Sequence, residues 1–215
     1  FIGPKTLITD VGSTKENILI QIRRKLKKKI LWVSSHPIAG SEMSGPDFGS
    51  SKLFLNRWCI LIKEKHTHKK NLNLLKKFWK RLGSKVLIMD PKKHDIIFSM
   101  TSHLPHLIAY NLINTASEFE KKKNYNLIKY SAGGLRDFSR IAASNEIMWR
   151  DIFFSNKSNL SQSINFFIKN LQSLKKNIET KNNKLIIKKL IKAKKVRQKI
   201  IKLKQDINKP DFGRN

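Results

Sequence analysis

The chain has 215 residues, of which 40% are hydrophobic, so it carries enough apolar material for a folded core, and wholesale disorder is excluded. Its 45 Lys and Arg residues against 15 Asp and Glu give a formal net charge of +30. We attribute this positive charge to mutational drift in an A/T-rich genome, because Lys, Asn and Ile, which have A/T-rich codons, are abundant together. The alternative is that the charge serves to bind a polyanion. The single cysteine, Cys59, excludes a disulfide scaffold and fits a reducing cytoplasm, and no apolar run is long enough to span a membrane.

The first 90 residues predict strands that alternate with helices. Ser13, with Glu16 three residues later, predicts a capping box that opens a helix running to about Lys29, and a second amphipathic helix is predicted over 70–82. The second predicted strand is broken at His36-Pro37. This alternation predicts an open α/β sheet with parallel strands. The predicted strands are 6–10, 30–35, 58–62 and 85–89.

At Asp90-Pro91 the pattern changes to helix. Asp is a favoured N-cap and Pro suits the first helical position, and helices are predicted from there to about Gln205. We therefore expect part of an α/β domain over 1–90, joined to an all-helical domain over 91–215. The apolar side chains of the helical half exceed what one small domain can hide, which favours a homodimer.

Two predicted strand ends carry reactive side chains. In an open α/β sheet, ligands bind beyond the carboxyl ends of the strands. Ser13 follows the first strand and His36 follows the second, so the two side chains share one crevice if these strands are parallel neighbours. The alternatives are that Ser13 only caps its helix and that His36 is a turn histidine fixed by Pro37.

The predicted helix after Asp90 carries a polar stripe on an otherwise apolar surface. Unpaired burial of such groups is costly, so the stripe predicts a polar site; a stripe that faces bulk solvent is the alternative, although exposed faces elsewhere in the chain are filled with Lys. His103 lies off the stripe and is either ligand-facing or structural, and Pro105 is expected to kink the helix. Spacings of four, three and four residues place on one helical face Asp95, Ser99, Ser102 and His106.

The segment 131–140 has two adjacent glycines, which let the backbone approach another group closely. Arg136 and Arg140 then fall one turn apart on a new helix. A guanidinium binds a carboxylate at two points, which Lys cannot do, so these residues predict an anion site. An ion pair with Asp137 or Asp151 is the alternative.

The chain also contains a series of motifs that follow one another from end to end. They are Asp10-Val-Gly-Ser-Thr-Lys15, His36-Pro-Ile-Ala-Gly-Ser-Glu-Met-Ser-Gly-Pro46, Asn56-Arg-Trp-Cys-Ile-Leu61, His94-Asp95, Ser102-His-Leu-Pro-His106, Ser131-Ala-Gly-Gly-Leu-Arg-Asp-Phe-Ser-Arg-Ile-Ala-Ala143, Met148-Trp-Arg-Asp-Ile152 and Pro210-Asp-Phe-Gly-Arg214. In this order they resemble the prephenate/arogenate dehydrogenase family, also called cyclohexadienyl dehydrogenases. The last motif resembles the alphaproteobacterial branch.

The resemblance implies an incomplete Rossmann-like nucleotide-binding domain followed by a helical substrate-binding and dimerisation domain. The implied activity belongs to tyrosine biosynthesis: oxidative decarboxylation of prephenate or arogenate to 4-hydroxyphenylpyruvate or tyrosine, with NAD or NADP as the hydride acceptor and no metal. The implied partners are a small-molecule substrate and a second copy of the chain. A membrane or nucleic-acid partner is not expected, and the cytoplasm is the expected location.

The resemblance also implies roles for individual residues. His36 is implied to accept the proton of the C4 hydroxyl as the hydride leaves, with Ser13 close to that hydroxyl and to the nicotinamide. Arg140 is implied to bind the substrate carboxylate. The other implied substrate-binding residues are His106, its helix partner Asp95, Glu42 at the pocket mouth, and Gly133 and Trp149, which the partner subunit is implied to contribute; the implied cofactor-binding residues are Ser13, Ser35 and Pro37.

The sequence departs from the family because it holds no G-x-G-x-x-G turn, which in the family binds the cofactor pyrophosphate at a helix N-terminus. The sequence opens at Phe1 rather than Met, and we expect it either to be incomplete or to have lost this part, and to bind cofactor very poorly as it stands. The alternative is a non-catalytic remnant or a basic polyanion-binding protein, best supported by 181–204. For that segment we favour a closing helix of the dimer domain with a solvated face.

Overall fold

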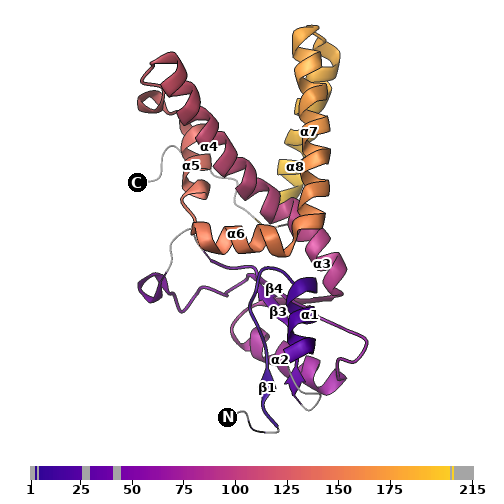
Figure 1. Ribbon diagram of the computed structural model, residues 1–215. Helices are drawn as coiled ribbons and strands as arrows, with labels where there is room; N and C mark the ends of the chain where they lie inside the picture. Colours follow the sequence, from indigo (N-terminus) through magenta and orange to yellow (C-terminus); the bar gives the residue numbers. More distant parts are fainter. Residues whose placement is uncertain (1–2, 4, 26–29, 41–44, 204, 206–215) are drawn as a thin grey trace. The chain divides into compact units, whose positions relative to one another are not determined.

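The computed structural model describes residues 3, 5–25, 30–40, 45–203 and 205. The chain divides into two compact units, Phe1–Ser163 and Ile164–Asn215 (Figure 1). The first unit holds the strands and six of the α-helices, and the second unit holds the rest of the helical chain.

Two small sheets form the N-terminal part of the first unit. The strand β1 (Leu7–Ile8) pairs in parallel with β2 (Leu31–Trp32). The strand β4 (Trp58–Ile62) pairs in parallel with β5 (Lys85–Met89), and β3 (Ser35–Pro37) pairs with β4 in the antiparallel direction. β4 and β5 have the bounds of the predicted strands 58–62 and 85–89, whereas β1 and β2 are shorter than the predicted strands 6–10 and 30–35.

The segment around His36 differs from the prediction. The expected break at His36-Pro37 is wrong, because both residues lie inside β3, with His36 opposite Ile60 and Pro37 opposite Cys59. β3 is the edge strand of its sheet, where a proline without an N–H is tolerated. The sheet is therefore mixed rather than parallel, and His36 projects from a strand instead of following one.

The helix α2 (Lys69–Arg81) lies between β4 and β5 in the chain and covers the sheet. Its apolar residues are spaced at three and four positions, so they form one buried stripe. Leu72, Leu75 and Trp79 pack with Val33 and with the inner residues of β4 to form a core cluster. This core fixes the strands from which the candidate site is built.

The helix α1 (Glu16–Lys25) shows that the predicted capping box is wrong. The helix begins at Glu16, and its first free N–H groups donate to the carboxylate of Asp95, a residue far along the chain. Lys15 N lies 2.8 Å from Asp95 Oδ1, and Glu16 N lies 2.9 Å from Asp95 Oδ2. A helix N-terminus favours a carboxylate, so Asp95 takes the place that the sequence pattern gave to Ser13.

The helix α3 (Pro91–Phe98) begins as predicted, because the Asp90 side chain accepts a hydrogen bond from Lys93 N at 2.8 Å. It continues through a π-helical turn, Ser99–His103, into α4 (Leu104–Lys123). Pro105 lies in the first turn of α4, and its missing N–H accounts for the irregular turn before it. The irregularity near Pro105 is thus a π-helical turn, and the expected kink stays a prediction.

Two further helices complete the first unit, and α5 packs against α4. Tyr110 of α4 donates a hydrogen bond to the Ser144 carbonyl at 2.6 Å, which ties the α5–α6 connection to α4. The remaining elements are the 3₁₀ turns Pro46–Phe48 and Ile128–Tyr130, α5 (Gly133–Ala142) and α6 (Glu146–Ser155).

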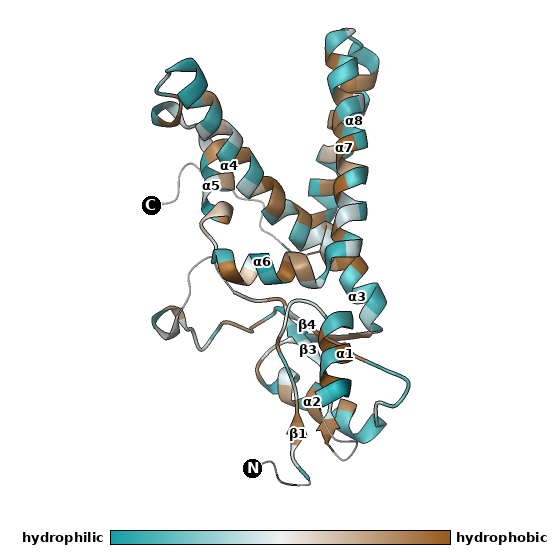
Figure 2. Ribbon diagram, viewed as in Figure 1, coloured by the Kyte–Doolittle hydropathy of each residue, from teal (hydrophilic) through white to brown (hydrophobic). Residues whose placement is uncertain are grey.

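The second unit is a helical hairpin. The helix α7 (Lys157–Glu179) begins in the first unit and continues into the second, where α8 (Asn183–Lys202) follows it. Lys189 Nζ of α8 donates to Ser173 Oγ of α7 at 3.0 Å. Figure 2 shows hydrophobic and hydrophilic residues interspersed along both helices, and no large hydrophobic side chain among the unit's described residues is buried. None of the described helices is both long enough and apolar enough to cross a bilayer.

Candidate active site

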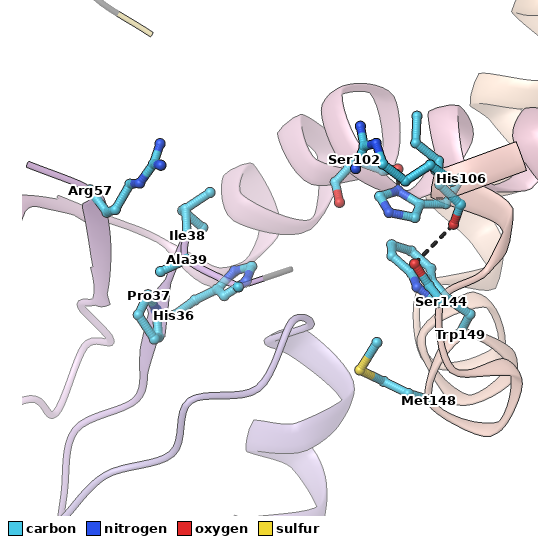
Figure 3. Close-up of a pocket in the computed structure, with 13 residues that line it drawn as sticks. His36, Pro37, Ile38, Ala39, Arg57, Ser102, His106, Ser144, Met148 and Trp149 are labelled. Atoms are coloured by element: carbon cyan, nitrogen blue, oxygen red, sulfur yellow. Dashed lines mark hydrogen bonds between the residues drawn. The ribbon is translucent and has the colours of Figure 1, made fainter. Parts of the chain in front are cut away.

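A cavity of about 460 Å³ lies in the first unit, between β3 with the residues that follow it and the helices α4, α5 and α6. Figure 3 shows His36 and Pro37 on one side, and His106, Ser144 and Trp149 on the other. The volume is that of a pocket for a small molecule. His36 from the strand and Arg140 from α5 line this same cavity, which agrees with the roles that the family resemblance implies for them.

A chain of hydrogen bonds runs from His36 into the protein. His36 Nδ1 lies 2.8 Å from His94 Nε2, and His94 Nδ1 lies 2.8 Å from Asp95 Oδ1. His94 and Asp95 are 0% and 1% exposed, whereas His36 lines the cavity. The Phe98 ring packs against both imidazoles, with centroids 4.9 Å and 4.5 Å away. The catalytic candidate is thus held by a buried pair on α3.

The Asp95 carboxylate accepts three N–H groups from two directions. Its Oδ1 accepts from Lys15 N and from His94, and its Oδ2 accepts from Glu16 N. A carboxylate with three donors is held in one orientation, and hydrogen bonds to a charged group are the stronger kind. Asp95 therefore joins the start of α1 to the His94 ring.

Lys15, which directly precedes α1, is a fully buried cation close to β3. Its Nζ lies 2.5 Å from Asp10 Oδ2 and 2.6 Å from the Ser35 carbonyl. Asp10 also accepts from Gly12 N and Ser34 Oγ, so the loop after β1 is tied to the start of β3. Burial lowers the pKa of Lys15, and Asp10 opposes that shift.

Burial keeps the imidazoles of this region neutral. It lowers the pKa of His36 to about 2, with smaller contributions from His94 and Lys15. It also lowers the pKa of His94, against the effect of the hydrogen bond to Asp95. A neutral imidazole has one N–H and one lone pair, so His36 is able to accept a proton.

The polar stripe of the predicted helix divides into two parts. Asp95 and Ser99 are buried away from the cavity, where Ser99 Oγ lies 2.9 Å from Ser163 Oγ. Ser102 and His106 line the cavity, so only this half of the stripe faces a ligand space. His103, for which a ligand-facing and a structural role were both left open, fits the structural role, because it is buried and its Nδ1 lies 3.2 Å from Asn156 Nδ2.

His106 and Trp149 form one wall of the cavity. His106 Nδ1 donates to the Ser102 carbonyl at 2.9 Å, and burial lowers the pKa of His106. Trp149 stacks on the His106 ring and is 6% exposed. Its indole Nε1 is buried with no hydrogen-bond partner among the described residues, which leaves a donor for a bound ligand.

The described lining contains two guanidinium groups and no carboxylate. Arg140 is half-buried on α5, and Arg57 is exposed just before β4. Two cations around a cavity of this size favour an anionic ligand, and guanidinium suits carboxylates. Glu42, the expected residue at the mouth, lies outside the described residues.

Of the other predicted site residues, Pro37 is in the cavity lining, and Ser13, Ser35 and Gly133 are not. Ser13 lies in the loop before α1, and Gly133 is exposed at the start of α5. Ser35 is fully buried, and its hydroxyl donates a hydrogen bond to the Asp10 carbonyl at 2.6 Å. Pro37 lines the cavity beside His36. Their roles toward cofactor and substrate stay predictions.

Sequence reasoning missed two residues of this region. His94 is adjacent to Asp95, and adjacent positions on a helix do not normally face one another, so spacing gave no signal for their contact. The motif His94-Asp95 was the one available sign. Arg57 belongs to the motif Asn56-Arg-Trp-Cys-Ile-Leu61, but its spacing gave no sign that the fold brings it to the cavity.

The described residues do not form a cradle for a dinucleotide pyrophosphate. The N-terminus of α1 is the natural anion site after β1, but Asp95 already accepts its N–H groups. A Cβ on Gly12 would lie 2.8 Å from Ile18 Cδ1, so a side chain at this position would require Ile18 to shift. His36 and Pro37 line the cavity on the side of β3. Among the described residues no cluster of His, Cys, Asp and Glu suits a metal ion.

Comparisons with known proteins agree along the chain. The family profile of the prephenate dehydrogenase nucleotide-binding domain matches residues 1–88, and that of the prephenate dehydrogenase dimerization domain matches residues 90–202. The chain is 35% identical over 191 residues to a cyclohexadienyl dehydrogenase of Zymomonas mobilis, covering 89% of this chain and 65% of that protein. It is 35% identical over 179 residues to a prephenate dehydrogenase of Bacillus subtilis, covering 83% of this chain and 48% of that protein.

The fold is also similar to a solved structure. The crystal structure of prephenate dehydrogenase from A. aeolicus in complex with hydroxyphenyl propionate and NAD+ superposes with a TM-score of 0.86 and 37% sequence identity, covering 93% of this chain and 68% of that one. The chain thus spans about two thirds or less of the length of the two curated relatives. Both family profiles, the two relatives and the fold lead to one conclusion: this chain belongs to the prephenate dehydrogenase family.

Proposed function

We propose that the protein is a prephenate or arogenate dehydrogenase of tyrosine biosynthesis. It would oxidise C4 of a cyclohexadienol and release the ring carboxylate as CO₂, giving 4-hydroxyphenylpyruvate from prephenate or tyrosine from arogenate. NAD or NADP, when bound, supplies the hydride acceptor. The observation that carries this proposal is that His36 and Arg140, from separate elements, line one cavity.

His36 is the proposed general base. Its ring is neutral, and Nδ1 is engaged by His94, so Nε2 is the nitrogen left to meet the substrate. As C4 loses its hydrogen as hydride, the C4 hydroxyl proton moves to Nε2 and the carbonyl or phenol oxygen keeps the O–H electrons. Cleavage of the C1–carboxylate bond supplies the electron pair that completes the aromatic ring. A positioned base of this kind contributes roughly 10²–10⁴-fold to the rate.

Cationic groups around the cavity are proposed to hold the substrate. Arg140 would bind one carboxylate, and the unpartnered indole N–H of Trp149 would donate to a substrate oxygen. The negative charge of a bound dicarboxylate favours the protonated form of His36, which counters the effect of burial during proton transfer. Substrate binding therefore prepares the base for its step.

We further propose a homodimer formed through the helical part of the chain. The second unit leaves Phe166, Leu171 and Leu190 exposed at 62%, 52% and 57%, and the matched profile is that of a dimerization domain. Burial of these side chains against a second copy would remove a large apolar surface from water. We place the protein in the cytoplasm, where its free Cys59 stays reduced.

The test has two independent parts. Calorimetric titration with hydroxyphenyl propionate, the compound bound to the A. aeolicus relative, should show binding that Arg140→Gln weakens about tenfold or more. The full-length protein should then form reduced nicotinamide and CO₂ from prephenate or arogenate, with NAD⁺ and NADP⁺ tried separately. Absence of both binding and turnover would overturn the proposal.

A further inference from the structure

The His36 ring has a fixed hydrogen-bond partner on one nitrogen only. Nδ1 lies 2.8 Å from His94 Nε2, and the described residues offer Nε2 no partner. Because His36 lines the cavity, which of its two nitrogens carries the proton decides whether it meets a ligand as a donor or as an acceptor. The groups behind it set that choice.

The direction of the hydrogen bonds follows from Asp95. Its carboxylate only accepts, so His94 must donate from Nδ1 across the 2.8 Å contact. A neutral His94 then carries its lone pair on Nε2, and the contact with His36 is satisfied only when His36 donates from Nδ1. The remaining lone pair of His36 lies on Nε2.

Resting on the proposed function, we infer that His94, itself oriented by Asp95, is a positioning residue that holds the His36 proton on Nδ1 and so presents Nε2 as the proton acceptor. It touches neither substrate nor cofactor; it acts through His36. When Nε2 takes the substrate proton, the resulting imidazolium donates from Nδ1 to a lone pair whose own ring is hydrogen-bonded to a carboxylate. The pair thus stabilises the charge that forms on the base.

The surroundings of the pair are consistent with this role. The titratable groups that act electrostatically on His36 or His94 are Asp95 on α3, Lys15 directly before α1, Asp10 in the loop after β1, and His103, besides the two histidines themselves. Lys15 donates its backbone N–H to the same Asp95 oxygen that meets His94, so the carboxylate cannot turn away. Full burial removes water as a competing partner.

The experiment reads the tautomer directly. Two-dimensional ¹⁵N–¹H spectra of ¹⁵N-histidine-labelled protein should show His36 protonated on Nδ1 in the wild type. His94→Leu removes the acceptor and should move the proton to Nε2, whereas His94→Gln keeps an amide oxygen in reach of Nδ1 and should restore the wild-type pattern. Ser99→Ala is the matched control, because Ser99 is buried in the π-helical turn that follows α3 and its hydroxyl bonds to Ser163 instead.

Kinetics of the same variants give the second readout. His94→Leu should lower kcat roughly 100-fold at nearly constant KM and change the acid limb of the pH–rate profile, with a substantial recovery in His94→Gln. A wild-type His36 protonated on Nε2, or a His94→Leu variant with unchanged tautomer and kcat, would overturn the inference. The two proposals fail separately: a wild-type protein with no turnover contradicts the proposed function, while the nitrogen spectra decide the tautomer on their own.

Discussion

His106 and Trp149 lie face to face, with ring centroids 3.7 Å apart and ring planes inclined by 19°. Because His106 Nδ1 is bonded to the Ser102 carbonyl, the imidazole cannot rotate away from the indole. The stack gives the cavity a rigid aromatic wall opposite His36, so the ligand space is shaped before anything binds.

This wall yields a prediction for Trp149. Trp149→Ala should lower the free energy of unfolding by about 3–5 kcal/mol, because it leaves a hole beside His106 and Phe153. Trp149→Phe, the control, keeps an aromatic face and should recover most of that loss. Urea denaturation followed by circular dichroism measures both, and equal stability of the two variants would contradict the assigned packing.

Replacement of the proposed base should affect turnover rather than binding. His36→Asn is expected to lower kcat roughly 10²–10⁴-fold with a small change in KM, since Asn cannot accept the hydroxyl proton. His66→Asn, at an exposed histidine, serves as the control. Steady-state assays of the full-length protein decide this, and wild-type kcat in His36→Asn would remove His36 from the mechanism.

Arg140→Gln should act mainly on substrate affinity. A charge-assisted contact with a carboxylate is worth about 1.5–3 kcal/mol, which corresponds to roughly a 10- to 150-fold weaker affinity. Arg136→Gln changes the same residue type one turn away, at an exposed position outside the cavity lining, and should bind as the wild type does. Titration with hydroxyphenyl propionate compares them, and equal affinities would place the carboxylate elsewhere.

The buried histidines predict that acid destabilises the fold. Burial lowers the pKa of His103 from 6.5 to about 4, so the unfolded chain binds a proton at a higher pH than the folded one. The contribution of His103 is present in full above pH 6.5 and is lost as the pH falls toward about 4, at up to about 1.4 kcal/mol per pH unit. Urea unfolding between pH 7 and 4 tests this. His103→Asn should flatten the dependence, and an unchanged slope in that variant would assign the effect to the other buried histidines.

The proposed dimer can be tested at the second unit. Phe166→Glu puts a charge among exposed apolar side chains and should shift the protein from dimer to monomer in size-exclusion chromatography with light scattering. Gln172→Glu adds the same charge at an exposed polar position of α7 and is the control. A dimer that persists in Phe166→Glu would move the interface away from this face.

Local patterns were sufficient where local interactions decide the structure. The strands 58–62 and 85–89 are apolar runs between breakers, and the Asp90 cap is a contact within one turn, so each was predicted. The shared cavity of His36 and Arg140 was predicted through the family resemblance and is confirmed.

Tertiary contacts account for the differences. The start of α1 depends on Asp95, about 80 residues away, so no capping pattern near Ser13 reports it. His36 lies in a strand because β4 offers an antiparallel partner, although Pro37 suggested a turn. The contact between His94 and His36 joins α3 to β3, so no pattern within either segment predicts it.

The Asp95 carboxylate has two functions, since it caps the N-terminus of α1 and also orients the ring behind His36. On the proposed mechanism, a substitution of Asp95 acts twice: it weakens the start of α1, which lowers stability, and it releases the His94 ring, which lowers turnover. We therefore expect strong epistasis at this position: replacement of Asp95 would demand accompanying changes both at the start of α1 and beside His94.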